Sequence, residues 1–391
     1  MVWEKVRLGD VCDVYGGTTP STSNPEYWNG EMVWLSPSDL PAIGEISHVK
    51  SSARKISNKA ISDSSLTVLP KGSVIYSTRA SIGKIAIAEV PLTTNQGFAN
   101  FVCNGKVFNK YLAYALKFYT RHIANLGSST TFAEVSRTSI KNFEIPLPSY
   151  ATQEKIAAIL DQAEALRIKD RLLLERYDEL LETVFYQLFS QYVHGSKAIV
   201  PLSDFIDINP RKSEIKVEPE TEVSFIPMSA VGENGELDAS VSKSYKDVSK
   251  GFTYFREGDV LFAKITPCME NGKGAIASGL KNGIGFGSTE FHVLRPNDQL
   301  KSEFIYSLLH QKWVRKFAES SMTGSAGQKR VPTDFFRRLR IYKPPIELQE
   351  KYSSIYLNIM AMKENAKKSS QYSEGLFQSL LQKALNGELI K

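Results

Sequence analysis

Two halves of this chain repeat each other, and this repeat limits the possible folds more than any other feature. The segment VRLGDVCDV, Val6 to Val14, returns as VPLSDFIDI, Val200 to Ile208. Further on, LPKGSVIYS, Leu69 to Ser77, returns as FREGDVLFA, Phe255 to Ala263. Other matches follow in the same order over nearly all of the 391 residues. Because chance does not produce colinear matches on this scale, the sequence predicts two copies of one structural unit.

Each copy consists of a globular part and a long helix that follows it. The globular part mixes short apolar runs with turns rich in Gly, Pro, Ser and Asn, a pattern that is typical of strands in a loop-rich domain. The predicted fold class is therefore α+β, with two repeated domains that each precede a long helix. The predicted strands are Leu66–Leu69, Val74–Ser77, Ile85–Ala88 and Val260–Ala263, the predicted shorter helices are Asn109–Leu126 and Ser302–Glu319, and the predicted domains are 1–150, 151–196, 197–346 and 347–391.

The two long helices carry apolar residues at seven-residue intervals, which is the pattern of a coiled coil. Gln153 of the first helix matches Gln349 of the second, and a whole number of heptads separates them. The two apolar seams are therefore in phase, as two helices that pack on each other need. The positions predicted to form the coiled coil or to contact a partner are Ile156, Leu160, Leu166, Leu173, Tyr177, Leu180, Val184, Tyr352, Ile355, Ile359, Met362, Leu376 and Leu380.

Composition argues against several classes of protein. No run of about 18 apolar residues is present, so no segment is predicted to span a membrane. The three cysteines lie far apart in the sequence, which argues against a disulfide framework and favours a cytoplasmic location. No two histidines stand at ligand spacing, so no zinc site is expected. The net charge of +6 is too small to identify a nucleic-acid-binding protein by itself.

Motifs for phosphate binding and for catalysis are incomplete. Gly83-Lys84 and Gly272-Lys273 lack the upstream glycine and the following Ser or Thr of a phosphate-binding loop. Glu257-Gly258-Asp259 resembles a carboxylate pair, but it lies where the first repeat has a turn before a strand. The chain is therefore predicted to be non-catalytic and to bind no metal or cofactor of its own.

The stretch NPEYW, Asn24 to Trp28, offers a competing interpretation. Enzymes that methylate an amino group of adenine or cytosine carry an Asn-Pro-Pro-aromatic motif, and NPEY differs from it by an acidic residue in place of the second proline. No glycine motif for a methyl donor accompanies it. We interpret the stretch as a turn in which Tyr27 and Trp28 pack the loop onto its domain.

Seven segments together form a specific combination of motifs. They are WEKVRLGDV (Trp3 to Val11), GGTTPST (Gly16 to Thr22), YWNGEMVWLSPSDL (Tyr27 to Leu40), STRASIGKIAI (Ser77 to Ile87), TTNQGF (Thr93 to Phe98), IPLPSYATQEKIAAIL (Ile145 to Leu160) and LLQKALNGELI (Leu380 to Ile390). In this combination the chain resembles the specificity subunit of type I restriction–modification systems over nearly its full length. The second half departs from the motifs, as expected where each half reads a different DNA sequence.

The resemblance implies a concrete function. Each globular half would be a target recognition domain that reads one half of a bipartite, asymmetric site in double-stranded DNA. The two long helices would pack antiparallel and set the gap between the half-sites, and with the adjoining domain surfaces they would dock two modification (methyltransferase) subunits. Two restriction (translocase and nuclease) subunits would join the full complex. In such a complex, which methylates adenine at N6, S-adenosylmethionine, ATP and Mg²⁺ would be used through the partner subunits.

Residues that could contact DNA are chosen by side-chain type and by their position in polar loops at strand ends. Arg and Lys suit guanine, Asn and Gln suit adenine, and Ser and Thr suit several bases. The candidates are Arg79, Lys84, Asn95, Gln96, Ser129, Thr130, Lys264, Thr266, Asn271, Lys273, Ser288, Thr289, Gln328, Lys329 and Arg330. Lys329 and Arg330 could instead hold phosphates, which positions the protein without specifying a sequence.

Three alternatives remain open at this point. The chain could be the specificity partner of a fused restriction and methylation enzyme. It could be a self-contained DNA methyltransferase that uses NPEY, which predicts methyl transfer by the chain alone. It could also be a coiled-coil scaffold without a role in DNA binding.

Overall fold

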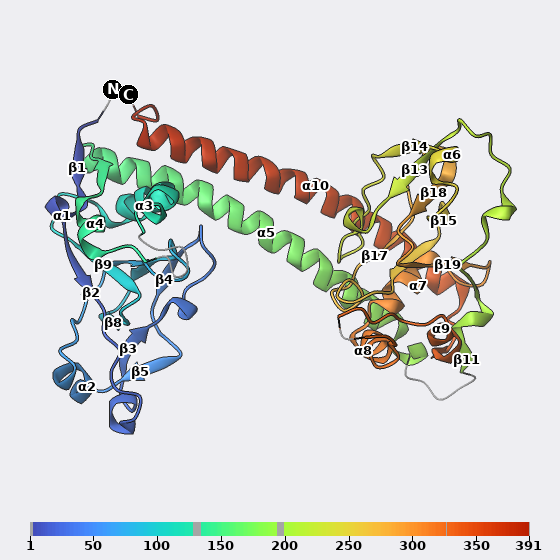
Figure 1. Cartoon of the computed structure of the whole chain (residues 1–391), viewed down its shortest axis with the longest axis horizontal. Helices are drawn as coiled ribbons and strands as arrows, with labels where there is room; N and C mark the ends of the chain where they lie inside the picture. The colour runs from blue at the N-terminus through green and yellow to red at the C-terminus, as the bar shows by residue number, and fades with distance from the viewer. Residues whose placement is uncertain (1–2, 128–133, 194–198, 326, 391) are drawn as a thin grey trace. The chain divides into compact units, whose positions relative to one another are not determined.

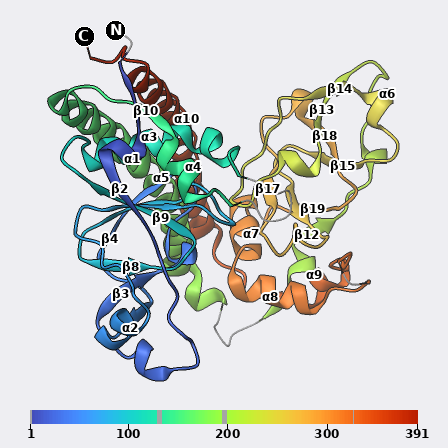
Figure 2. The ribbon, with the colours of Figure 1, turned by 60° about the vertical axis from the view of Figure 1, so that its left-hand side comes forward.

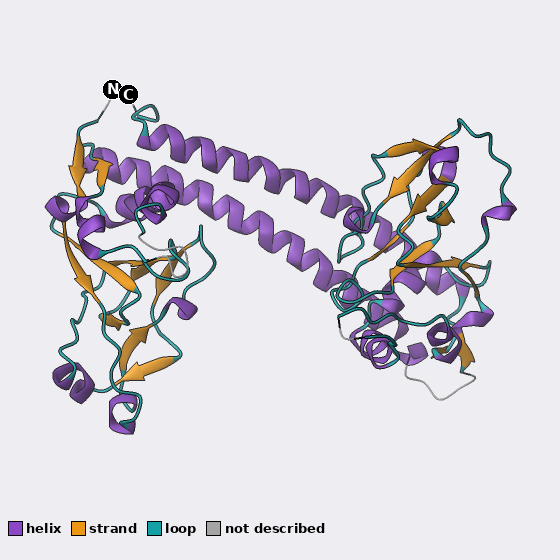
Figure 3. Ribbon diagram, in the orientation of Figure 1, coloured by secondary structure: helices purple, strands orange, loops and turns teal. Residues whose placement is uncertain are grey.

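The chain folds into two compact units in a computed structural model, which describes residues 3–127, 134–193, 199–325 and 327–390 (Figure 1). Unit 1 comprises residues 1–170 and 369–391, and unit 2 comprises residues 171–368. Each unit contains short strands, long loops and helices (Figure 3), and each has its own hydrophobic core. The predicted α+β class is confirmed, whereas the predicted boundaries near 150, 196 and 346 stay predictions.

Unit 1 is built on a five-stranded sheet in the order β2-β9-β6-β7-β4 and a three-stranded sheet in the order β5-β3-β8 (Figure 2). A short pairing of β1 with β10 brings the start of the chain beside the segment that leads into the first long helix. The elements are β1 (Lys5–Arg7), α1 (Leu8–Val11), β2 (Cys12–Gly16), η1 (Pro25–Trp28), β3 (Met32–Leu35), η2 (Pro37–Asp39), β4 (Ile46–Val49), β5 (Arg54–Ile56), α2 (Asn58–Asp63), β6 (Val74–Ser77), β7 (Ile85–Ala88), β8 (Leu92–Thr94), β9 (Phe98–Cys103), α3 (Asn109–Ala124), α4 (Arg137–Asn142) and β10 (Glu144–Pro146).

Unit 2 repeats much of this plan, but each of its two main sheets has four strands. The sheet that corresponds to the larger sheet of unit 1 has the order β12-β19-β16-β17, the second sheet has the order β14-β13-β18-β15, and β11 pairs with β20. The elements are β11 (Val200–Pro201), η3 (Leu202–Asp204), β12 (Ile206–Ile208), η4 (Lys212–Glu214), β13 (Glu222–Ile226), η5 (Met228–Ala230), β14 (Ser242–Ser244), α6 (Tyr245–Val248), β15 (Thr253–Arg256), β16 (Val260–Ala263), β17 (Gly274–Ile276), η6 (Lys281–Gly283), β18 (Ile284–Gly287), β19 (Phe291–Pro296), α7 (Ser302–Leu309), α8 (Lys312–Ser320), α9 (Asp334–Arg338) and β20 (Arg340–Ile341). The predicted internal repeat is confirmed by four strands of the larger sheet, since β2-β9-β6-β7 of unit 1 recurs as β12-β19-β16-β17 in unit 2.

Two predicted elements were wrong in detail. Leu66–Leu69 is not a strand, because only Leu69 forms an isolated bridge, to Leu92, while its neighbours lie in loop. The predicted helix Ser302–Glu319 is divided into α7 and α8, because Gln311 adopts extended backbone angles that end one helix and begin the next.

The two long helices, α5 (Tyr150–Val193) and α10 (Ile346–Leu385), each contribute residues to both units. In unit 1, Nε of Arg167 on α5 lies 2.7 Å from Oε2 of Glu374 on α10. Farther along α5, Asp170 accepts a hydrogen bond at 3.3 Å from Ser369, which lies earlier on α10. The helix segments are therefore antiparallel in unit 1.

The same arrangement holds in unit 2. Lys363 of α10 forms an ion pair with Asp178 of α5. The ring of Phe185, farther along α5, lies 5.5 Å from the ring of Tyr352, which comes earlier on α10. The predicted antiparallel coiled coil is thus present in each unit.

The predicted heptad seam was only half right. A heptad seam has two inward positions in every seven residues, which form a first and a second column along the helix. Ile156, Tyr352 and Ile359 of the first column are buried, as predicted. The second column was placed one residue too early: Met362 and Leu376 are 50% and 49% exposed, whereas Lys363 and Phe377 are buried. Of the other predicted positions, Leu160 is buried, and Leu166, Leu173 and Leu180 are exposed. The partly buried ones are Tyr177, Val184, Ile355 and Leu380.

The second column was misplaced because some residues that occupy it in the structure are polar. That column contains Lys363 in α10 and Arg167 in α5, and the first column contains Asp170, so apolarity alone favours the wrong positions. The inward charges are paired, with Lys363 on Asp178 and Arg167 on Glu374. The exposed leucines and methionine therefore do not line the helix seam, and their role in contacting a partner stays a prediction.

A buried glutamine fastens the start of each long helix to its own globular part. Gln153 is fully buried; its Oε1 accepts from the backbone N–H of Phe108 at 2.7 Å, and its Nε2 donates to the carbonyls of Lys106 and Pro148. This side chain therefore joins the segment that leads into α3 to the segment that leads into α5.

Gln349 repeats these contacts in unit 2. Its Oε1 accepts from the backbone N–H of Lys301 at 2.9 Å, and its Nε2 donates to the carbonyls of Gln299 and Pro344. The matched glutamines of the sequence repeat are thus matched structural clamps, and each makes the same three hydrogen bonds.

Replacing Gln153 with methionine is expected to lower the free energy of unfolding of unit 1 by about 1–3 kcal/mol, because a buried backbone donor and two carbonyls lose their partner. Denaturant unfolding monitored by circular dichroism measures the change. Gln162→Met, at an exposed position of the same helix, is the matched control and should change stability by less than about 0.5 kcal/mol. Equal losses in the two variants would contradict the clamp.

Candidate nucleic-acid interface

In unit 1, polar loops gather at the end of the larger sheet where β6 ends and β9 begins. The backbone N–H of Thr78 donates to the carbonyl of Gly97 at 2.9 Å, which joins the loop after β6 to the loop before β9. Arg79 and Gln96 are exposed on these two loops, and Asn95 is partly buried beside them. The structure therefore brings three of the predicted DNA-contacting residues together.

The side chains of this surface are partly held by the protein itself. Oε1 of Gln96 accepts from the hydroxyl of Thr19 at 2.5 Å, and Oδ1 of Asn95 accepts from the backbone N–H of Gly97 at 2.9 Å. Nε of Arg79 lies 3.8 Å from a carboxylate oxygen of Glu134, and both side chains are about half exposed. An exposed ion pair of this length is weak, so Arg79 can exchange its partner for another anion at little cost.

Two of the predicted DNA-contacting lysines make hydrogen bonds within the protein. The ammonium of Lys84 donates to the carbonyls of Pro37 and Leu40 at 2.8 and 3.0 Å. The ammonium of Lys273, at the matching position of the repeat, donates to the carbonyl of Met228 at 3.2 Å. Lys84 thus holds the loop after β3, and Lys273 holds the loop after β13. Contact with DNA stays a prediction for both lysines.

In unit 2, the corresponding loops meet at the same end of the larger sheet. The backbone N–H of Lys264 donates to the carbonyl of Glu290 at 2.9 Å, and that of Thr266 donates to the carbonyl of Lys329 at 3.0 Å. The guanidinium of Arg330 binds the carboxylate of Glu290, with Nε at 2.9 Å from one oxygen and Nη2 at 2.8 Å from the other. The structure thus brings Lys264, Thr266, Lys329 and Arg330 together.

Electrostatics at this cluster favour charged Arg330 and Glu290. The hydrogen bond from Arg330 lowers the pKa of the Glu290 carboxyl, and the same bond raises the pKa of Arg330. Burial lowers the pKa of Lys264. Burial also lowers the pKa of His292 to about 4, so this ring is neutral, and its Nε2 lies 2.8 Å from the carbonyl of Val331.

The other candidates differ in exposure. The backbone N–H of Glu290 donates to the hydroxyl of Ser288 at 3.2 Å, and Thr266 donates from its hydroxyl to Glu270 at 3.2 Å. The candidates that are exposed on the loops are Asn271, Thr289, Gln328 and Lys329. Ser129 and Thr130 lie outside the described residues.

Sequence reasoning missed the acidic partners at both surfaces. Glu134 and Glu290 pair with Arg79 and Arg330, and both lie far from their arginine along the chain. Their only signal in the sequence was a carboxylate beside polar candidates, as in Ser288-Thr289-Glu290. Such carboxylates can neutralise an arginine side chain until a DNA phosphate or base replaces them.

The NPEYW stretch is a structural turn, as predicted. Asn24 caps η1 by accepting at Oδ1 from the backbone N–H of Glu26 at 3.1 Å. The hydroxyl of Tyr27 donates to Asp63, and the Trp28 ring meets Trp34 edge to face at 5.1 Å. Asn24, the residue that would hold a target amino group, is thus engaged with its own backbone.

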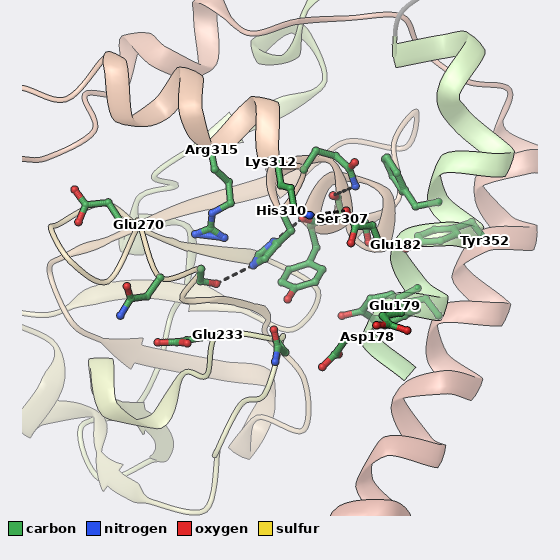
Figure 4. Close-up of a pocket in the computed structure, with 18 residues that line it drawn as sticks. Asp178, Glu179, Glu182, Glu233, Glu270, Ser307, His310, Lys312, Arg315 and Tyr352 are labelled. Atoms are coloured by element: carbon green, nitrogen blue, oxygen red, sulfur yellow. Dashed lines mark hydrogen bonds and ion pairs between the residues drawn. The ribbon is translucent and has the colours of Figure 1, made fainter. Parts of the chain in front are cut away.

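Unit 2 contains a cavity of about 390 Å³ that is lined by several titratable side chains (Figure 4). His310 projects into it, but its two ring nitrogens face the carbonyls of Tyr306 and Gly272 at 2.8 and 2.9 Å. Burial, with Arg315 nearby, lowers the pKa of His310 to about 4. Both nitrogens are thus directed at the protein's own backbone, so the ring is poorly placed to take a proton from a substrate.

The described part of the chain contains no group of His, Cys, Asp and Glu side chains placed to hold a metal ion. None of its helices combines the length and the apolar character needed to cross a membrane.

Comparisons with known proteins identify the family. The model of the type I restriction modification DNA specificity domain matches residues 2–175 and again residues 196–370. The specificity subunit of type I restriction enzyme MjaIX from Methanocaldococcus jannaschii is 34% identical over 66% of this chain and 51% of that protein. The specificity subunit of EcoAI from Escherichia coli is 41% identical over 47% of this chain and 31% of that protein. The chain thus spans about half the length, or less, of these two relatives.

Solved structures share the fold. The S subunit of a type I restriction–modification system from M. genitalium has a TM-score of 0.59 at 15% identity and covers 98% of this chain and 96% of its own. A chain from a structure of type I R-M complex assembly has a TM-score of 0.56 at 19% identity and covers 99% of this chain and 98% of its own. With two copies of one fold, each matched by the same family model, this chain belongs to the family of type I restriction–modification DNA specificity proteins.

Proposed function

We propose that this chain is the DNA sequence-specificity subunit of a type I restriction–modification complex. One observation carries the proposal: the specificity-domain model matches both halves, and four strands with the same order in each larger sheet gather polar loops at the same sheet end. Unit 1 and unit 2 would each read one part of a bipartite, asymmetric target. The chain itself would catalyse nothing and would work in the cytoplasm.

The chemistry of the complex would come from its partners. Two modification subunits would bind S-adenosylmethionine and methylate adenine at N6, and two restriction subunits would use ATP and Mg²⁺. Exposed apolar residues of the long helices, including Leu166, Leu180 and Met362, support a docking role for these helices. The self-contained methyltransferase is disfavoured because Asn24 is occupied as a helix cap.

Retention of DNA tests this proposal. The chain with its modification subunits is expected to retain DNA in a sequence-dependent and strongly salt-dependent manner, because phosphate contacts release counterions. Lys329→Ala should weaken retention on all sequences and lower the slope of log affinity against log salt by about one. Lys383→Ala, at an exposed position of α10, is the matched control and should leave the slope unchanged.

Two outcomes would contradict the proposal. Retention that does not depend on sequence would indicate a scaffold. Methyl transfer to DNA by the purified chain alone would indicate a self-contained enzyme.

A further inference from the structure

Two cysteines that are far apart in the sequence are direct neighbours in unit 1. Cys12, the first residue of β2, stands opposite Cys103, the last residue of β9, in the antiparallel register. The adjacent backbone N–H of Asn104 donates to the carbonyl of Val11 at 3.3 Å, so the hydrogen-bonded pair is the next one along. Cys12 and Cys103 therefore form a non-hydrogen-bonded pair, in which side chains are closest and Cα atoms are about 4.5 Å apart.

This separation falls within the range of about 4.4–6.8 Å that is found for disulfide-bonded cysteines. Both side chains lie on the same face of the sheet, where Cys12 belongs to the main core of unit 1 and Cys103 packs at its margin. We propose that Cys12 and Cys103 are a redox modification site, an oxidisable dithiol that hydrogen peroxide converts into an intrachain disulfide. The proposal does not rest on the function proposed above.

The two thiols differ in access to solvent. Cys12 is 2% exposed, whereas Cys103 is partly exposed and lines a surface cavity of about 370 Å³ together with Phe108 and Tyr150. A small oxidant can therefore reach Cys103 first. Cys12 is shielded and can react only with its neighbour.

The thiols also differ in acidity. The hydrogen bond between them lowers the pKa of the Cys103 thiol and raises the pKa of the Cys12 thiol, and burial raises the latter further. Because the thiolate is the nucleophile in such oxidations, Cys103 is the attacking residue and Cys12 the resolving residue.

Oxidation of the two thiols by hydrogen peroxide would take place in two steps. The Cys103 thiolate attacks one oxygen of hydrogen peroxide, an S–O bond forms, the O–O bond breaks, and the departing hydroxide takes a proton to become water. Cys12 then loses its proton and attacks the Cys103 sulfur, so that an S–S bond forms, the S–O bond breaks and a second water leaves. Two thiols are oxidised by two electrons in total, and one peroxide is reduced to two waters.

The cross-link would affect the strand that leads to the candidate interface. β2 is the edge strand of the larger sheet and continues through Gly16-Gly17 to Thr18, whose N–H donates to the carbonyl of Thr94 at 2.8 Å. A disulfide would tie the start of this strand to β9. Oxidation would therefore add a covalent link to an edge that hydrogen bonds and core packing hold in the reduced chain.

Thiol counting on the folded full-length chain tests the proposal. After treatment with hydrogen peroxide, the wild type and Cys268→Ser are each expected to lose two thiols, and dithiothreitol should restore them. Peptide mapping should place the disulfide between Cys12 and Cys103. The third cysteine, Cys268, lies in unit 2 and provides the matched control.

Two further variants separate the attacking residue from the resolving one. In Cys12→Ala the sulfenic acid of Cys103 cannot be resolved, so dimedone should label Cys103. In Cys103→Ala, dimedone should leave Cys12 unlabelled while the chain stays folded. Retention of all three thiols in the treated wild type, a disulfide that includes Cys268, or equal dimedone labelling of Cys12 and Cys103 in these variants would overturn the proposal.

Discussion

Replacing Phe377 with alanine is expected to lower the free energy of unfolding of unit 1 by about 3–5 kcal/mol, the range found when a buried phenylalanine is truncated. Phe377 lies near the end of α10 and is fully buried in the core of unit 1 with Leu381 and Leu160. Its ring also receives two cations, since Nζ of Lys117 lies 4.2 Å and Cζ of Arg167 lies 4.7 Å from the ring centre. Truncation removes the apolar contact and leaves both cations facing a cavity.

Denaturant unfolding of the full chain measures this effect, with Tyr372→Ala as the matched control. Tyr372 is an aromatic residue on the same helix but is 79% exposed, so its removal should cost less than about 0.5 kcal/mol. A loss below about 1 kcal/mol for Phe377→Ala would show that the end of α10 is not part of the core of unit 1.

Replacing Asp259 with asparagine is expected to destabilise unit 2 by about 3–5 kcal/mol, because the buried Arg295 guanidinium loses the buried one of its two carboxylate partners. Asp259 is 1% exposed and binds Arg295 through two hydrogen bonds of 2.8 Å. One carboxylate oxygen also accepts from the backbone N–H of Arg256 at 2.8 Å. Asparagine keeps one acceptor but removes the buried negative charge beside the guanidinium, which then has only the more exposed Glu214 as a charged partner.

Asp298→Asn, at an exposed position of the same unit, is the control and should leave unfolding unchanged within about 0.5 kcal/mol. The double variant Asp259→Leu with Arg295→Met should recover much of the loss, because apolar groups can replace a buried ion pair without leaving a charge behind. If Asp259→Asn alone unfolds at the wild-type denaturant concentration, the buried pair carries no stability.

The internal repeat made the architecture predictable. Matching segments of the two halves became matching strands, so that β2-β9-β6-β7 recurs as β12-β19-β16-β17. The in-phase glutamines Gln153 and Gln349 became equivalent clamps with equivalent partners. Such features were accessible because the sequence states them twice, and local chemistry at each copy agrees with the other.

Features that depend on contacts between distant segments could not be predicted. The heptad pattern favoured Leu376 over Phe377 and Met362 over Lys363, because paired charges in the true seam disguised it. The ion pair of Arg330 with Glu290 joins residues 40 positions apart.

The contacts of individual side chains also could not be predicted from the sequence. Side-chain type singled out Lys84 for DNA contact, although its ammonium is held by two backbone carbonyls. The spacing of the cysteines argued against pairing, yet Cys12 and Cys103 face each other across two strands. Which segments meet is decided by the tertiary fold, and side-chain type alone does not reveal it.

The central claim, that each unit reads one part of a bipartite target, is tested most directly by mapping methylated bases. The chain is produced with its modification subunits, first unaltered and then with residues 1–150 replaced by the corresponding half of another family member. The proposed function predicts methylation at a two-part site, of which the replacement changes one part and leaves the other intact. An unchanged site, or a change in both parts, would contradict it.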